Sequence, residues 1–374
     1  MNNRIAFVSG SRADYRYLHS ILVNLKKIKC ESFEFIVTGG HLDSRFGKTV
    51  NEIKFDGIDI NREIPLFDYE SNIKIPYQLS IGIESFSNYF EKINPSLIVI
   101  AGDRYEILAV AISAFFLDIE IVHIGGGETT SGSKDNSIRH CISNLAKYHF
   151  PSNKEAEKLL IKFGIDKKNI FCLGSTGLED FYKYEPIKRN ILFKKFNLNP
   201  KEKLALVTVH SDSLGEENLN LIKNVIKALE NYDIQIIFTA ANADNGGDKI
   251  NAFIKDLIKL KNKYFYIPNL GRLDYISVMN SADLMIGNSS SGLTEAPSLG
   301  LPVVNIGKRQ EGRLRGGNVI DADNNVKAIV NAIKKCLNKN FKDSLKDKIN
   351  PYYKGPVSEQ IAKKLLTLHK KVYD

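Results

Sequence analysis

Four polar residues of this 374-residue sequence stand where side chains can carry protons. Asp103 follows the apolar run SLIVIAG, at the expected carboxyl end of a strand, where a carboxylate held partly out of water can act as a base. Glu128, Asp135 and His140 lie in the loop and helix start after the next such run, IEIVHIGGG. This grouping predicts an acid/base site. The alternative for Asp103 alone is that it caps the following helix.

A turn of small residues, SGS at 9–11, leads from the first expected strand into Arg12 and a helix. A guanidinium group binds phosphate through two parallel hydrogen bonds, so Arg12 is a candidate phosphate clamp. The alternative is an ion pair between Arg12 and Asp14. Because the turn lacks the GxGxxG pattern, it argues against a nicotinamide enzyme.

A second candidate anion site is GNSSSGLTEAP at 287–297, which reads as a strand, a small-residue loop and a helix start. Amide groups at the start of a helix attract anions, so Ser290, Ser291 and Gly292 are predicted to bind a diphosphate. Glu295, one turn later, is predicted to accept hydrogen bonds from ribose. The alternative is a simple capping box of Ser and Glu. The loop after the next strand adds positive charge through Arg309, Arg313 and Arg315.

Two more loops are expected at the same edge. His210 ends the run LALVTVH, and the segment NADNG at 242–246 follows IQIIFTA. In open parallel sheets, ligands bind beyond the carboxyl ends of the strands, where loops and helix starts meet. Both loops are therefore expected to face the same cleft as the candidate anion site, at the carboxyl edge of the sheet.

The elements that position these residues alternate between short β-branched runs and longer amphipathic segments, the pattern of a parallel sheet covered on both faces. The boundary between two doubly wound α/β units is expected near 174–180, giving domains 1–175 and 176–356. A final helix, about 357–374 with Ser358 as N-cap, is expected to pack back on the first domain. The expected strands are 4–10, 33–40, 96–103, 119–127, 204–210, 234–240, 282–288 and 302–307.

The composition is that of a globular protein, with 43% hydrophobic and 25% charged residues. No apolar run approaches the roughly 20 residues of a membrane span, and MNNRIAFVSG leaves no room for a secretory signal, so a soluble cytoplasmic protein is expected. The net charge of +9 is expected on solvated lysine-rich helix faces near 162 and 255, without a nucleic-acid recognition module. The four cysteines, at 30, 141, 172 and 336, have no CxxC spacing and are expected to be reduced.

Eight motifs in order resemble the hydrolysing UDP-N-acetylglucosamine 2-epimerases over nearly the whole chain: GSRADY, GDRYE, HIxGGE, DxSIRH, VTxH, NADxG, GNSSSGLxEAPS and NIGxRQxGRxRG. The resemblance implies a GT-B fold, in which two Rossmann-like domains form an interdomain cleft. It also implies conversion of UDP-N-acetylglucosamine and water to N-acetylmannosamine and UDP, by elimination to a 2-acetamidoglucal and then hydration. A homodimer or homotetramer is expected on the same basis.

The resemblance also implies roles for individual residues. The acid/base carboxylates would be Asp103, Glu128 and Asp135. The diphosphate would be bound by Arg12, His210, Ser290, Ser291 and Gly292, with Arg313 on the phosphate side. Glu295 would bind the ribose. His210 would also take part in catalysis. Neither a metal nor another cofactor is expected, and His123, His140 and His149 are expected to be structural or orienting residues.

Two departures from the family pattern leave the substrate open. The family usually has Glu or His where this chain has Gly125, and Asn136 stands beside Asp135 in place of a second acid. Gly125 could make room for a different sugar, such as a UDP- or GDP-linked 2,4-diacetamido-2,4,6-trideoxyhexose on the route to legionaminic acid. Three competing functions are a non-hydrolysing epimerase, a GT-B glycosyltransferase and a nucleotide-binding module without catalysis.

Overall fold

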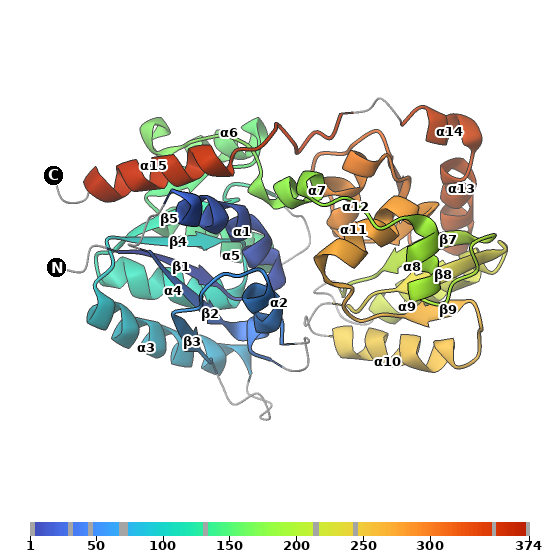
Figure 1. The fold of residues 1–374 in the computed structure, drawn as a ribbon, viewed down its shortest axis with the longest axis horizontal. Helices are drawn as coiled ribbons and strands as arrows, with labels where there is room; N and C mark the ends of the chain where they lie inside the picture. Colours follow the sequence, from blue (N-terminus) through green and yellow to red (C-terminus); the bar gives the residue numbers. More distant parts are fainter. Residues whose placement is uncertain are drawn as a thin grey trace. The chain divides into compact units, whose positions relative to one another are not determined.

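All eight expected strands are strands in the computed structural model, which describes residues 4–28, 33–43, 48–66, 74–129, 134–211, 217–241, 246–345 and 349–371. The chain divides into two units (Figure 1). Unit 1 comprises Met1–Thr129, Lys134–Asp180 and Tyr352–Asp374, and unit 2 comprises Phe181–Pro351. The chain passes from unit 1 to unit 2 between Asp180 and Phe181, at the end of the 174–180 region in which the boundary was expected.

Unit 1 is a six-stranded parallel sheet in the order β3-β2-β1-β4-β5-β6. Helices α1 and α15 pack together on one face, while α3, α4 and α5 pack on the other. The strands are β1 (Ile5–Ser9), β2 (Phe33–Thr38), β3 (Arg62–Ile64), β4 (Leu97–Ala101), β5 (Glu120–Ile124) and β6 (Tyr148–Phe150). The α-helices are α1 (Arg12–Lys27), α2 (Val50–Phe55), α3 (Ile75–Ile93), α4 (Tyr105–Phe116), α5 (Lys134–Leu145), α6 (Lys154–Lys162), α7 (Glu179–Lys183, which runs into unit 2) and α15 (Ser358–Lys371). The 3-10 helices are η1 (Gly39–His41), η3 (Lys167–Asn169) and η4 (Thr176–Leu178).

Unit 2 repeats this arrangement with the order β12-β11-β10-β7-β8-β9. One hydrophobic core lies under α9, α10 and α13, and another under α8 and α11. The strands are β7 (Lys203–Thr208), β8 (Ile234–Phe238), β9 (Tyr264–Tyr266), β10 (Leu284–Gly287), β11 (Val303–Ile306) and β12 (Val319–Ala322). The helices are α8 (Arg189–Lys195), α9 (Glu217–Leu229), α10 (Gly247–Ile258), α11 (Gly271–Ser281), α12 (Ser291–Thr294), η5 (Ala296–Leu299), α13 (Val326–Cys336) and α14 (Lys339–Asp343).

The four strands that the sequence did not reveal, β3, β6, β9 and β12, are the edge strands of the two sheets. Each has three or four residues, and all but β9 contain a polar or charged residue that breaks the continuous apolar run of a strand buried on both faces. The eight strands that were expected are the inner ones. Apolar patterning therefore located the strands that the sheet buries and missed those at its margins.

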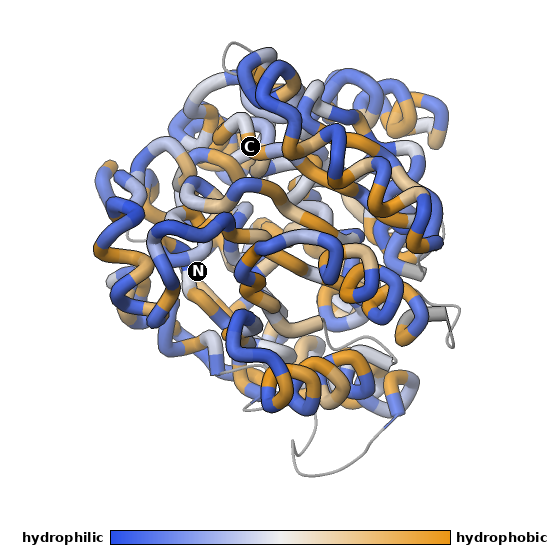
Figure 2. Tube along the Cα trace, turned by 90° about the vertical axis from the view of Figure 1, so that its right-hand side faces the viewer, coloured by the Kyte–Doolittle hydropathy of each residue, from blue (hydrophilic) through white to orange (hydrophobic). Residues whose placement is uncertain are grey.

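The helices bury one side, as amphipathic segments should. In α1, Leu18, Ile21, Leu22 and Leu25 recur at the helical period and are fully buried under the sheet. Burying each leucine or isoleucine side chain stabilises the fold by about 1.5–3 kcal/mol before entropy is counted. Figure 2 shows the same alternation of hydrophilic and hydrophobic turns along the surface helices.

The prediction that Ser358 is the N-cap of the final helix is wrong, because α15 begins at Ser358 and Val357 takes the cap position. The buried carboxylate of Glu179 caps this helix from a distant part of the chain. Its Oε1 accepts hydrogen bonds from the amides of Val357 (2.8 Å) and Ser358 (2.6 Å). Helix α15 contacts α1 and belongs to unit 1.

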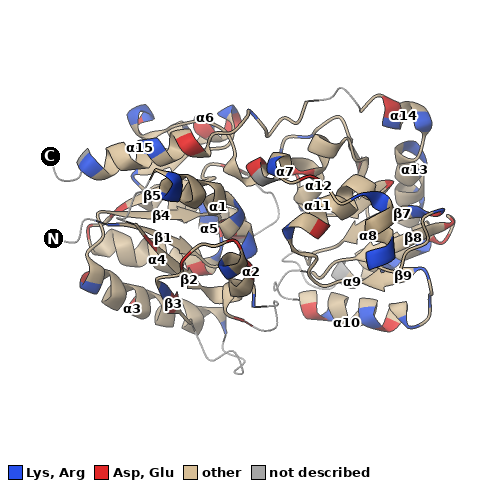
Figure 3. Cartoon of the chain, in the orientation of Figure 1, with Lys and Arg blue, Asp and Glu red and all other residues tan. Residues whose placement is uncertain are grey.

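The lysine-rich segments lie on the surface, as expected. Lys158 and Lys162 of α6, and Lys255 and Lys259 in and after α10, are exposed. Figure 3 shows Lys and Arg spread over the outer helices of each unit. Within the described ranges, no helix is both long enough and apolar enough to cross a bilayer.

Candidate active site

Each sheet reverses its strand order at one point, between β1 and β4 in unit 1 and between β7 and β10 in unit 2. Ligands of doubly wound sheets bind at the carboxyl edge beside this reversal. Arg12 and Asp103 follow β1 and β4, while His210 and Ser290 follow β7 and β10. The topology therefore brings the candidates to the ligand-binding edge of each sheet.

Asp103 is held by an arginine that the sequence analysis did not single out. The guanidinium of Arg139, from α5, forms an ion pair with the Asp103 carboxylate. The Arg139 side chain is 4% exposed and that of Asp103 25% exposed, so the carboxylate faces outward from a buried cation. The N-cap of α4 is Arg104, so Asp103 does not have the capping role considered for it above.

Arg139 also fixes the backbone at Glu128, since its Nη1 donates to the Glu128 carbonyl oxygen at 2.8 Å. The Glu128 carboxylate in turn accepts a hydrogen bond from the hydroxyl of Ser152, which follows β6. Asp135 lies one helical turn before Arg139 on α5, so the two share a face of that helix. The structure thus groups Asp103 and Glu128 around one buried cation, with Asp135 on the same helix.

Sequence reasoning missed Arg139 and Ser152. Arg139 is the arginine of SIRH, so its motif was visible although its role was not. Ser152 follows a three-residue edge strand and carried no such signal.

His123 anchors the loop that presents Asp103. Its Nε2 donates to the carbonyl oxygen of Gly102 at 2.8 Å, and its Nδ1 accepts from the Ser143 hydroxyl at 3.1 Å. Burial lowers the pKa of His123 to about 3, so the ring is neutral at physiological pH. It therefore orients the backbone beside Asp103 without adding charge.

The three glycines after β5 have different roles. An added Cβ would lie 2.7 Å from Nδ1 of His123 at Gly126 and 2.5 Å from the carbonyl oxygen of Ala156 at Gly127. The glycines at these two positions are therefore needed for close packing within the protein. At Gly125 a Cβ would meet nothing within 4 Å, although φ is +77°.

Arg12 is the first residue of α1 and is exposed at the carboxyl edge of unit 1. Its charge, together with burial as the larger cause, lowers the pKa of His41 to about 3. The carboxyl group of Asp14 accepts hydrogen bonds from the amide of Gly10 (3.1 Å) and the hydroxyl of Ser11 (3.0 Å). Asp14 is therefore bonded to the turn that precedes Arg12.

In unit 2, Asn288 holds His210 in place. Its side-chain oxygen accepts from the His210 amide at 2.7 Å, and its side-chain nitrogen donates to the His210 carbonyl at 2.8 Å. The backbone carbonyl of Asn288 accepts from Arg309 (3.1 Å) and Gln310 (2.9 Å). Asn288 thus links the loops after β7, β10 and β11, a role that the sequence analysis did not assign.

The predicted diphosphate loop forms only a single helical turn, α12. The amide of Gly292 bonds to the Ser289 carbonyl at 3.2 Å, and a Cβ on Gly292 would lie 2.8 Å from the Val303 side chain. The Ser291 hydroxyl bonds to that of Tyr275 at 2.5 Å. Gly292 is therefore required for packing on β11, and diphosphate binding by Ser290, Ser291 and Gly292 stays a prediction.

The other nucleotide candidates lie nearby in unit 2. Glu295 follows α12 and is 4% exposed, and Arg313 is half-buried. Arg315 instead bonds Asp321 through Nε at 3.0 Å, which gives it a role in the loop. Most of the NADNG segment, residues 242–245, lies outside the described residues.

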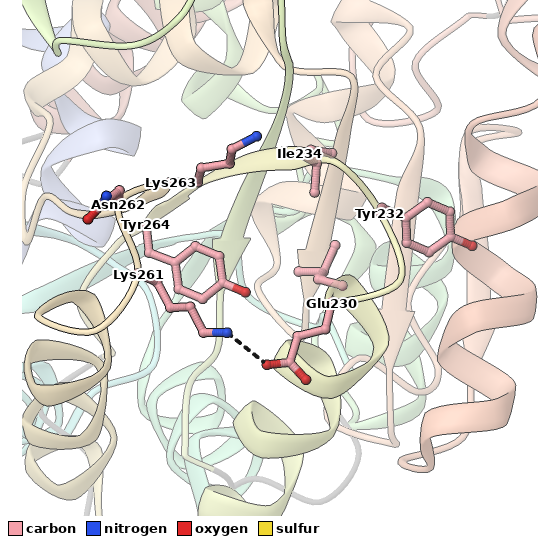
Figure 4. Close-up of a pocket in the computed structure, with 8 residues that line it drawn as sticks. Glu230, Tyr232, Ile234, Lys261, Asn262, Lys263 and Tyr264 are labelled. Carbon is pink, nitrogen blue, oxygen red and sulfur yellow. Dashed lines mark hydrogen bonds and ion pairs between the residues drawn. The ribbon is translucent and has the colours of Figure 1, made fainter.

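A shallow pocket lies at the opposite, amino edge of the unit 2 sheet (Figure 4). Tyr232, Lys263 and Tyr264 line it, and the Lys261 ammonium pairs with Glu230 at 3.3 Å. It shares no residue with the candidate site. In the described part of the chain, no three His, Cys, Asp or Glu side chains are grouped to hold a metal ion.

Comparison with known proteins places these residues in a family. The sequence matches the UDP-N-acetylglucosamine 2-epimerase family over residues 24–366. The chain belongs to this family. It is 36% identical over 372 residues to the UDP-N,N′-diacetylbacillosamine 2-epimerase (hydrolysing) of Legionella pneumophila, covering 98% of this chain and 97% of the relative. It is also 36% identical over 345 residues to the GDP/UDP-N,N′-diacetylbacillosamine 2-epimerase (hydrolysing) of Campylobacter jejuni, covering 91% and 89%.

The fold is shared with solved structures of the same family. The crystal structure of Neisseria meningitidis UDP-GlcNAc 2-epimerase bound to UDP-GlcNAc superposes with a TM-score of 0.85 at 18% identity, covering 97% of this chain and 100% of that one. Two Rossmann-like units with parallel six-stranded sheets make up the GT-B fold. The resemblance drawn from the motifs is thereby confirmed for family and fold.

Proposed function

We propose that this protein is a hydrolysing 2-epimerase that converts a UDP-linked 2-acetamido sugar and water to the free 2-epimeric sugar and UDP. The observation that carries the proposal is the grouping of Asp103 and Glu128 around the buried Arg139, in a chain that belongs to the 2-epimerase family. A buried guanidinium favours the charged form of a carboxylate beside it, which is the form that accepts a proton.

The first candidate substrate is UDP-N,N′-diacetylbacillosamine. Two relatives at 36% identity are named for this sugar, and the space beside Gly125 leaves room for a substituent that a bulkier residue would exclude. UDP-N-acetylglucosamine is the second candidate, supported by the description of the family. The relative from Campylobacter jejuni adds the GDP-linked form of the diacetamido sugar to the set to be tested.

The proposed reaction has two steps. Asp103 removes the C2 proton, the C1–O bond breaks, and UDP leaves with the bonding electrons, so that a C1=C2 double bond remains. Water then adds its oxygen to C1, and Glu128 or Asp135 delivers a proton to the opposite face of C2. The positive charge that develops at C1 is stabilised by the nearby carboxylates.

The leaving nucleotide is proposed to be bound by two sets of residues. Arg12 follows β1 in unit 1. In unit 2, the Ser290–Gly292 loop and Arg313 would bind the phosphates, Glu295 the ribose hydroxyls, and His210 the diphosphate as it departs. The bonds from Asn288 support the role of His210, because a backbone held at both its amide and its carbonyl keeps the ring in position.

The test is to incubate the protein with the UDP-linked diacetamido sugar, its GDP-linked form and UDP-N-acetylglucosamine, in D₂O and separately in ¹⁸O-water. We expect free nucleotide and a 2-epimeric sugar with deuterium at C2 and ¹⁸O at C1, and no ¹⁸O in the nucleotide. Nucleotide that carries ¹⁸O, or sugar without deuterium at C2, would show a hydrolysis of another kind. No free nucleotide from any of the three sugars would refute the proposal.

Two variants separate the proposed roles. Asp103→Asn should abolish turnover and retain UDP binding, because it removes the base and leaves unit 2 intact. Glu295→Ala should chiefly weaken UDP binding, measured by calorimetry. The reverse pattern would contradict the assignment.

A further inference from the structure

Two buried carboxyl groups lie side by side at the carboxyl edge of the unit 1 sheet, and the proposed reaction uses neither. Asp14, in the first turn of α1, is 1% exposed, and Glu106, in the first turn of α4, is 2% exposed. Burying one carboxylate is costly, and burying two next to each other is more so. Their location beside the reversal of strand order calls for an explanation in terms of the site.

Three glycines make room for this pair. A Cβ on Gly102 would lie 2.6 Å from Oδ1 of Asp14, and one on Gly39 would lie 2.8 Å from Cγ of Glu106. A Cβ on Gly10 would lie 3.1 Å from Cβ of Glu106. The loops after β1, β2 and β4 therefore close directly onto the two carboxyl groups.

The positive charge in this buried site, the guanidinium of Arg104, forms an ion pair with Glu106. The Arg104 guanidinium approaches both Glu106 oxygens, with Nε at 3.2 Å from Oε2 and 3.4 Å from Oε1. The bonds of Asp14 come from neutral donors, the Gly10 amide and the Ser11 hydroxyl. When two carboxyl groups share a buried site with one cation, the group farther from the cation retains its proton.

We propose that Asp14 is a positioning residue that acts in its neutral form. Its carboxyl group bonds the turn before Arg12 and packs on Gly102, the residue before Asp103, so that it fixes the separation of the two loops. The inference rests on the proposed function only for the roles of Arg12 and Asp103. Ionisation of Asp14 would place a second negative charge beside Glu106 and push these loops apart.

The electrostatics agree with this geometry. Burial raises the pKa of Asp14 to about 7, and the charge of Glu106 adds to the rise, while Arg104 opposes it. On η1, burial lowers the pKa of His41 to about 3, so that ring contributes no charge near neutrality. Asp14 would therefore ionise within the pH range in which an enzyme works.

The competing explanation is that Asp14 is an ordinary helix cap. Ser11 is the N-cap of α1, and a carboxylate three residues later commonly bonds back to the turn. A capping carboxylate is ionised and gains stability from the helix dipole as pH rises through about 4. The two explanations predict opposite pH dependences of stability.

The first measurement uses no substrate. Thermal unfolding midpoints of the wild type, Asp14→Asn and the control Glu34→Gln are compared from pH 4.5 to 8.5. Glu34 is also buried but lies near the amino end of β2, bonded to Arg4 and Tyr89. We expect the wild type to lose stability relative to Asp14→Asn between pH 4.5 and 7, because only the unfolded chain ionises there, and the difference to be constant above pH 7. A difference that rises with pH, or stays constant throughout, would overturn the proposal.

The second measurement is the pH dependence of kcat/KM for nucleotide release. The ratio of Asp14→Asn to wild type should rise about thirtyfold from pH 6 to 8.5, as a single ionisation near pH 7 requires. The ratio for Glu34→Gln should not change with pH. A constant ratio for Asp14→Asn would refute the positioning role. Absence of turnover with every sugar would instead refute the proposed function, and the unfolding data would still decide the state of Asp14.

Discussion

Replacing Arg139 with methionine tests the core of the candidate site, because this one side chain holds both the Asp103 carboxylate and the Glu128 carbonyl. Removing one partner of a buried ion pair costs about 3–5 kcal/mol. The Asp103 side chain is 25% exposed, so water can partly solvate the stranded carboxylate and the loss should be about 3 kcal/mol. For units of this size that corresponds to a fall of about 6–12 °C in the unfolding midpoint.

The effect on catalysis should be larger than the effect on stability suggests. Without the guanidinium, the Asp103 carboxylate and the Glu128 carbonyl lose the group that fixes their positions. A displacement of the base by about 1 Å costs about 100-fold in rate. Arg139→Lys, which keeps the charge but loses the two-pronged geometry, should lower kcat/KM about tenfold.

Arg189 in unit 2 provides a matched control. It is half-buried, donates to the Ser281 carbonyl and, at 2.9 Å, to the Glu202 carbonyl, and stacks on Phe193 at 4.0 Å. Arg189→Met should also lower the unfolding midpoint but leave kcat/KM at the wild-type value. If Arg139→Met retains a kcat/KM within about twofold of the wild-type value, the reasoning on Asp103 is refuted.

Three further predictions concern the loops and the buried histidines. Gly127→Ala should lower the free energy of unfolding by at least about 3 kcal/mol and Gly125→Ala by only about 1–2, because both have φ near +77° but only residue 127 faces a backbone oxygen at 2.5 Å. Equal losses in urea unfolding would contradict this. Asn288→Ala should weaken UDP binding by about tenfold in calorimetry, since His210 loses both backbone bonds; unchanged affinity would argue against the role of that loop. Burial lowers the pKa of His149 to about 4, so from pH 6.5 down to 4 the unfolded chain binds a proton that the folded chain does not, and stability falls. His149→Gln should therefore reduce the slope of unfolding free energy against pH in that window by about 1.4 kcal/mol per pH unit, and an unchanged slope would show that this ring is protonated in the fold.

The fold was predictable where burial leaves a continuous signal in the sequence. Inner strands such as β4 and β10 are apolar throughout because both faces of the sheet are covered. An edge strand such as β3 is three residues long and two of them are exposed and charged, so its pattern is indistinguishable from a loop. The N-cap of α15 was predicted wrongly for a different reason. Glu179 bonds to the start of this helix from 179 residues away, and no local sequence pattern indicates such a bond.

From the sequence alone one could infer the family, the two doubly wound units and the sheet edge at which the polar residues gather, because loop composition and the succession of elements along the chain are properties of short segments. The contacts of each polar residue became known only from the folded structure. Arg139 pairs with Asp103 across 36 residues, and Asp14 and Glu106 share one buried site although α1 and α4 are far apart in the chain. Ionisation and orientation depend on distances between such segments and on the water excluded from between them. Neither quantity can be read from the order of the residues.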